Sequence, residues 1–137
     1  MHLRARSMVL VFVGGALGTA ARAALSQALP PLAGVPVAVL GINVLGAAVL
    51  GLLLELLRRA GDDRGRRRDL RLFAGTGVLG GFTTYSALAA DTASLVAGGR
   101  AGVATAYALG TLVLGLVAAL LGVLVGTRLG ARRGHPS

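Results

Sequence analysis

Four long apolar stretches follow one another along the chain, separated by short polar turns. They cover about residues 8–27, 36–57, 70–96 and 101–127. Each is close to the roughly 20 residues that a helix needs to cross a bilayer. The pattern predicts an all-α membrane protein in which residues 1–137 form a single domain of four transmembrane helices.

The third stretch is too polar and too rich in glycine for an ordinary membrane helix, chiefly within residues 75–91. Within it the run Gly-Gly-x-Thr-Thr at residues 80–84 predicts a break in the helix at membrane depth. A broken helix offers free carbonyls to a cation on one side and free N–H groups to an anion on the other. Tyr85 adds a ring with an electropositive edge. The third helix is therefore a candidate ion site.

Composition and charge fit a membrane protein better than a soluble one. Residues are 55% hydrophobic and only 14% charged, and the net charge of +9 comes from 14 Arg without Lys. Twelve of these arginines flank the apolar stretches on one side, seven of them at residues 58–71, without the interleaved aromatic residues that would stack on nucleic-acid bases. The positive-inside rule therefore places both termini and this loop in the cytoplasm, in a cell inner membrane.

Few side chains could carry chemistry within the apolar stretches. Cys is absent, His2 and His135 lie near the ends, and Glu55 and Asp91 are the acids in or beside the spans, so an enzyme is not expected. Glu55 is expected to form an ion pair with the arginines that follow it. The candidates for ion transport are Arg22, Asn43, residues 80–86, Asp91, Tyr107 and Thr111.

Three of these candidates also have structural interpretations, which stay open. Arg22 lies near the end of the first span, where a guanidinium either serves function or extends to the interface. Asn43 fits an interhelical hydrogen bond slightly better than an ion site. Hydroxyls such as that of Thr83 commonly bond to a carbonyl of their own helix.

Three motifs in order resemble the Fluc (CrcB) family of fluoride channels. They are Gly14-Gly15-x-x-Gly18-x-x-x-Arg22, Asn43-x-x-Gly46 and Gly77-x-x-Gly80-Gly81-x-Thr83-Thr84-Tyr85-Ser86. The resemblance implies an antiparallel dimer of the dual-topology type, in which two narrow pores passively export cytoplasmic fluoride and so reduce its toxicity. It also implies a structural Na⁺ at the dimer centre, held by the backbone carbonyls of Gly80 and Thr83.

The same resemblance assigns roles to side chains. Arg22 would line the vestibule and Asn43 the anion pore. The complete set that we expect along the pore is Asn43, Tyr85, Ser86, Leu88, Tyr107 and Thr111. Fluoride is small and strongly hydrated, so such a pore has to replace lost water with hydrogen-bond donors and aromatic edges.

One part of the resemblance fails. The family's Phe-Ser-Thr-Phe reads Tyr85-Ser86-Ala87-Leu88 here, so the second ring and one hydroxyl are missing. Together with the strong charge bias, this leads to our hypothesis of a heterodimer with an oppositely oriented paralogue, and a homodimer stays open. The alternatives are a non-conducting partner subunit and a small multidrug-type exporter. The exporter needs an acid in the first span, where this chain has Arg22.

Overall fold

The computed structural model describes residues 2–132, and three of its helices are long and apolar enough to cross a membrane. These are α1 (His2–Ala28), α2 (Val37–Arg59) and α6 (Ala101–Arg132). They overlap the predicted spans 8–27, 36–57 and 101–127. Arg133, one of the twelve arginines on the charged side, and His135 lie outside the described residues. The chain is therefore an all-α membrane protein.

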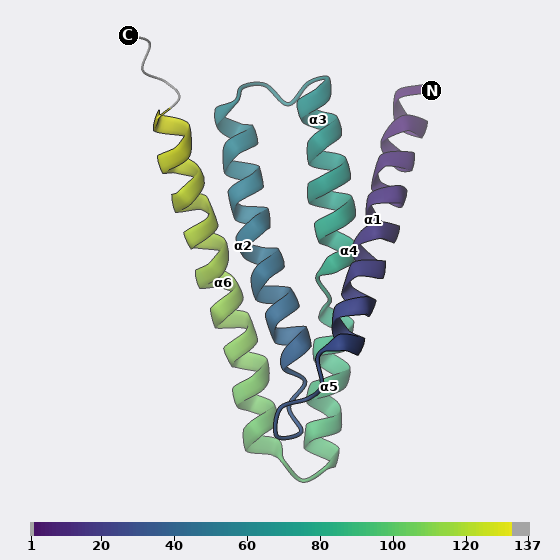
Figure 1. The fold of residues 1–137 in the computed structure, drawn as a ribbon, viewed down its shortest axis with the longest axis vertical. Coiled ribbons are helices and arrows are strands. Elements are labelled where there is room, and N and C mark those ends of the chain that lie inside the picture. The colour runs from purple at the N-terminus through teal and green to yellow at the C-terminus, as the bar shows by residue number, and fades with distance from the viewer. Residues whose placement is uncertain (1, 133–137) are drawn as a thin grey trace.

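The region between α2 and α6 is helical but divided. It consists of α3 (Arg66–Leu70), the π-helical segment η1 (Arg71–Leu79), α4 (Gly80–Phe82) and α5 (Tyr85–Ala97). The first three form one rod in Figure 1, and α5 follows after an extended connection. The expectation that residues 58–71 form one loop is wrong in part. Residues 58–59 end α2, and residues 66–70 are helical.

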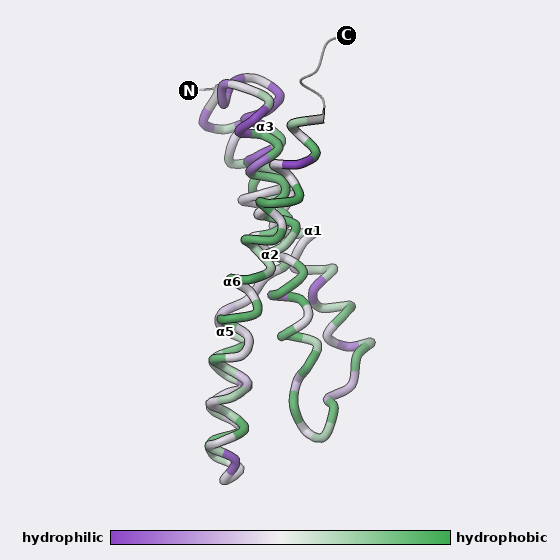
Figure 2. Tube along the Cα trace, turned by 90° about the vertical axis from the view of Figure 1, so that its left-hand side faces the viewer, coloured by the Kyte–Doolittle hydropathy of each residue, from purple (hydrophilic) through white to green (hydrophobic). Residues whose placement is uncertain are grey.

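The helices stand side by side with their connections at two ends (Figure 1). One end carries the start of α1, the connection from α2 to α3 and the end of α6. Figure 2 shows hydrophilic residues gathered at this end, around α3. The other end carries the α1–α2 and α5–α6 connections, joined where the Arg100 guanidinium donates to the Ala33 carbonyl at 3.1 Å.

Glycines bring α1 into backbone contact with η1 and α4. A Cβ atom on Gly14 would collide with the Phe73 carbonyl, and one on Gly18 with the Val78 carbonyl. Gly81 faces the Gly15 backbone in the same way. The glycine spacing of the first span therefore does what small residues do in membrane helix pairs, which is to allow close approach.

The α2–α6 pair is fixed by glycines and by one buried acid. Gly51 packs on the Ala119 carbonyl and Gly122 on the Ala48 carbonyl. Glu55, only 6% exposed, accepts hydrogen bonds from Arg58 at 2.9 Å and from the Thr127 hydroxyl at 3.1 Å. The expected ion pair of Glu55 is confirmed, and it also ties α2 to α6.

Large apolar side chains cover the outside of the bundle. Phe12 is 77% exposed and Leu116 64% exposed, and many other Leu and Val side chains are similarly open. A soluble monomer would not expose so much contiguous apolar surface, whereas lipid or another subunit would cover it.

Candidate functional site

The site is centred on the extended connection between α4 and α5. Thr83 (ψ 154°) and Thr84 (ψ 120°) leave the helical conformation, and α5 starts again at Tyr85. The Thr84 hydroxyl accepts a hydrogen bond from the Ala87 N–H at 3.2 Å, so Thr84 is the N-cap of α5. The interruption is thus built by a residue type that favours a helix start.

Asn43 of α2 holds this connection by two hydrogen bonds to the Thr84 backbone. Its amide nitrogen donates to the Thr84 carbonyl at 3.0 Å, and its amide oxygen accepts from the Thr84 N–H at 2.8 Å. The Thr84 N–H would otherwise close the helix onto the Gly80 carbonyl. Asn43 therefore makes the interhelical hydrogen bond that the sequence favoured, and it retains one further N–H.

Side chains of α1 satisfy the carbonyl end of α4. The Arg22 guanidinium donates to the Gly81 carbonyl through Nε at 3.2 Å, and the Thr19 hydroxyl approaches the same oxygen at 3.4 Å. A cation at a helix C-terminus is favourable because the last carbonyls carry partial negative charge. Arg22 does not simply extend to the interface. Thr19 was not among the predicted site residues, although its spacing of three from Arg22 places both on one helix face.

Thr83 and Gly80 lie differently around the same break. The Thr83 hydroxyl donates to the Leu79 carbonyl at 2.9 Å, as expected for a hydroxyl that bonds within its own helix. Its methyl group fills the space beside Gly46, where a Cβ would collide with it. Gly80 is exposed, and a Cβ there would meet no atom within 4 Å. The Gly80 backbone is thus accessible from outside the bundle.

Several of the predicted pore residues line one pocket of about 390 Å³ beside the break. These are Asn43, Tyr85, Leu88 and Thr111, joined by Thr83, Thr84 and apolar residues of α2 and α6. Tyr85 is 78% exposed, whereas Leu88 is 5% exposed and belongs to the core with Val39 and Leu95. The pocket therefore combines a few polar groups with a largely apolar wall.

Ser86 and Tyr107 do not line this pocket. The Ser86 hydroxyl lies 3.2 Å from that of Thr84, at the exposed start of α5. Tyr107 is buried, and its hydroxyl lies 3.2 Å from the Asp91 carboxylate and 3.4 Å from the Pro36 carbonyl. Tyr107 and Asp91 thus join α6 to α5 near the start of α2, which gives Asp91 a structural partner.

The hydroxyl of Thr111 faces its own helix. It donates to the Tyr107 carbonyl at 2.7 Å and is buried. A hydroxyl has one proton to donate, so Thr111 offers the pocket a lone pair and no donor in this arrangement. Side-chain donors near the pocket include the second Asn43 N–H and the Tyr85 hydroxyl and ring edge.

A metal site made of side chains is not found in the described part of the chain. Residues 2–132 contain no group of three or more His, Cys, Asp or Glu side chains close enough to hold a metal ion. A cation would therefore need backbone carbonyls, of which the break releases several.

Fold and site together define a class: a small all-α membrane protein whose polar groups gather where one helix is interrupted. The family described as "CrcB-like protein, Camphor Resistance (CrcB)" matches residues 9–123. The chain belongs to this family.

The chain is similar in sequence to fluoride-channel relatives over most of its length. It is 58% identical to "Fluoride-specific ion channel FluC 2" of Leifsonia xyli subsp. xyli, over 98% of this chain and 92% of the relative. It is 50% identical to "Fluoride-specific ion channel FluC 1" of Cutibacterium acnes, over 80% of this chain and 78% of the relative. It is 42% identical to "Fluoride-specific ion channel FluC" of Thermus thermophilus, over 79% of this chain and 85% of the relative.

Proposed function

We propose that this chain is a subunit of a fluoride-specific channel that lets cytoplasmic fluoride leave the cell passively. The observation that carries the proposal is the extended Thr83–Thr84 connection, held by Asn43 and flanked by Tyr85 beside a pocket. The names of the relatives describe channels and not enzymes, which agrees with the absence of a catalytic constellation from the sequence.

The start of α5 is the part of the site suited to an anion. A helix N-terminus presents backbone N–H groups and positive partial charge. Tyr85 adjoins it with a ring edge, and Asn43 adds its remaining N–H. Such donors would replace part of the hydration shell that fluoride loses in a narrow pore.

A second chain would complete the pore, because one chain leaves this site open to the outside of the bundle. We propose an antiparallel dimer in the cell inner membrane in which residues 70–96 form the third of four spans, and this third span is broken. The exposed Tyr85 and Gly80 faces support it, since both would otherwise meet lipid. The arginines gathered at one end support cytoplasmic termini.

Sodium fits the carbonyl end of the break. The Gly80 carbonyl loses its usual helical donor because the Thr84 N–H bonds to Asn43, and Gly80 is exposed. A hard cation prefers several oxygen ligands, so Gly80 and Thr83 of two chains would form a more complete set than one chain offers. When bound, Na⁺ would neutralise the partial charges of these carbonyls and hold the two chains together.

Flux measurements on the purified protein test this function. Liposomes containing only this chain are loaded with potassium fluoride or potassium chloride, and efflux is followed with ion-selective electrodes. We expect fluoride efflux without chloride efflux. Comparable efflux of both anions would refute a fluoride channel.

A non-conducting partner subunit is the second candidate, favoured by the burial of Leu88 in the core, where the family has an aromatic ring. If the chain is such a partner subunit, it gives no fluoride efflux alone. Co-expression with an oppositely oriented paralogue then gives fluoride efflux. Robust fluoride efflux from the pure protein would exclude the obligate-partner version.

A further inference from the structure

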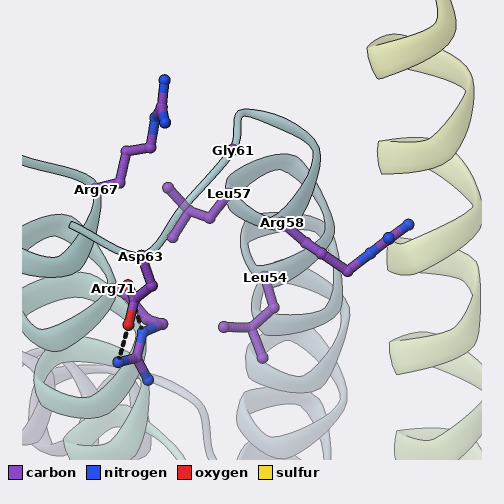
Figure 3. A pocket seen from close by; sticks show the side chains of 7 residues that line it. All are labelled: Leu54, Leu57, Arg58, Gly61, Asp63, Arg67 and Arg71. Carbon is purple, nitrogen blue, oxygen red and sulfur yellow. Dashed lines mark hydrogen bonds and ion pairs between the residues drawn. The ribbon is translucent and has the colours of Figure 1, made fainter.

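A pocket of about 340 Å³ lies at the charged end of the bundle, between the end of α2 and the connection into η1. Figure 3 shows its lining, with leucines and Arg58 on α2 and the other charged residues on the connection and the helix beyond it. The lining residues with side chains are Leu54, Leu57, Arg58, Asp63, Arg67 and Arg71. The pocket therefore has an apolar side toward the membrane and a cationic rim.

The rim carries more positive than negative charge. Arg71 forms an ion pair with Asp63 at 2.5 Å, and Arg58 pairs with Glu55. Arg67 has no ion pair within residues 2–132, and in Figure 3 its side chain points away from the Arg71–Asp63 pair. The lining thus contains three arginines and one acid, and Arg67 has its full donor capacity available for an anion.

The pocket continues toward the middle of the bundle. A second pocket of about 290 Å³ shares Leu54 and Arg71 with the first and adds Leu50, Gly75 and Thr76. Together they form a groove between α2 and η1. Below Arg71 its only hydroxyl-bearing lining residue is Thr76, so a hydrated anion would lose its water without replacement, whereas an acyl chain would contact leucines.

We propose that this groove binds an anionic phospholipid. The phosphate contacts Arg67 at the rim, and one acyl chain lies along Leu54 and Leu50. Basic clusters directly beside membrane helices attract anionic headgroups, and the leucines below them supply the apolar half of the site. This site is separate from fluoride conduction, so its presence does not depend on the function proposed above.

Lipid retention by the full-length protein tests the headgroup contact. The protein is equilibrated in micelles containing equal amounts of phosphatidylglycerol and phosphatidylcholine, and bound lipid is counted by native mass spectrometry. We expect Arg67→Gln to lower phosphatidylglycerol retention about fivefold, the effect of one arginine at a charged membrane surface. The matched controls are Arg66→Gln and Arg68→Gln, whose side chains do not line the pocket. Equal losses in all three variants, or no preference for phosphatidylglycerol, would overturn the site.

A second pair of variants tests the acyl contact. Leu54→Trp fills the groove where its two pockets meet, and it should reduce retention of phosphatidylglycerol. Leu116→Trp, on the exposed face of α6, should not. Unchanged retention in Leu54→Trp, or full displacement of the lipid by millimolar inorganic phosphate, would show a headgroup site only and would refute the lipid groove.

Discussion

Removal of the Asn43 side chain should destabilise the helix interruption more than any other single loss of a polar group at the site. Asn43→Ala deletes both partners of the Thr84 backbone, whose N–H and carbonyl it holds at 2.8 Å and 3.0 Å. Thr84 is only 9% exposed, so water cannot freely replace the amide. The variant therefore leaves one donor and one acceptor unsatisfied beside an apolar pocket.

The magnitude follows from the cost of such groups. An unsatisfied buried donor or acceptor costs about 1–3 kcal/mol. Hydrogen bonds between membrane helices average only about 0.6 kcal/mol, because groups in the unfolded state find other partners. Thr84 is in an extended connection with no neighbouring turn to accept its N–H. The larger cost, that of an unsatisfied buried group, therefore applies to each of its two backbone groups. We expect a loss of about 2–6 kcal/mol in the free energy of unfolding for the two groups together.

Reversible unfolding in mixed detergent micelles, followed by circular dichroism, measures this loss. The matched control is Thr105→Ala, which removes an exposed hydroxyl bonded only to the Ala101 carbonyl of its own helix. Thr105→Ala should change the unfolding free energy by less than about 0.5 kcal/mol, as surface substitutions usually do. If Asn43→Ala behaves like Thr105→Ala, the two hydrogen bonds do not hold the interruption and the reasoning fails.

Further variants test the packing, the cap and the pore. Gly18→Ala places a methyl group against the backbone of η1 and α4 and should cost at least about 1–3 kcal/mol of unfolding free energy, whereas Gly41→Ala, with open space around it, should cost nothing. Arg22→Met removes the charge-assisted bond to the Gly81 carbonyl, and in the same unfolding assay we expect a loss of about 1.5–3 kcal/mol, with a smaller loss refuting the cap. Tyr85→Phe should leave fluoride efflux unchanged, because it keeps the ring edge next to the start of α5; loss of efflux would make the hydroxyl essential.

The sequence predicts those parts of the fold that depend on local pattern. Apolar length alone indicates α1, α2 and α6, since each must match the thickness of a bilayer. The spacing of Gly14 and Gly18 likewise predicts a close helix contact, and both glycines face the backbone of η1. In these cases the relevant information lies within a few turns of one helix.

The sequence does not predict contacts between distant segments. Asn43 and Thr84 are 41 residues apart, and nothing in either segment indicates that the amide would bond to that backbone. The same holds for the contact between Tyr107 and Asp91, and for Leu88, whose side chain lines the pocket beside the break and also packs in the core. The role of such residues depends on which neighbours the complete fold brings to them.

The partners at the interruption explain why one break could serve two kinds of ion. Arg22 occupies the Gly81 carbonyl from α1, and Asn43 occupies both backbone groups of Thr84 from α2. What this leaves is asymmetric, because the Gly80 carbonyl on one side lacks its helical donor, and the start of α5 on the other presents N–H groups next to Tyr85. The first favours a cation and the second an anion, so the two side chains that hold the break open also separate its two ends.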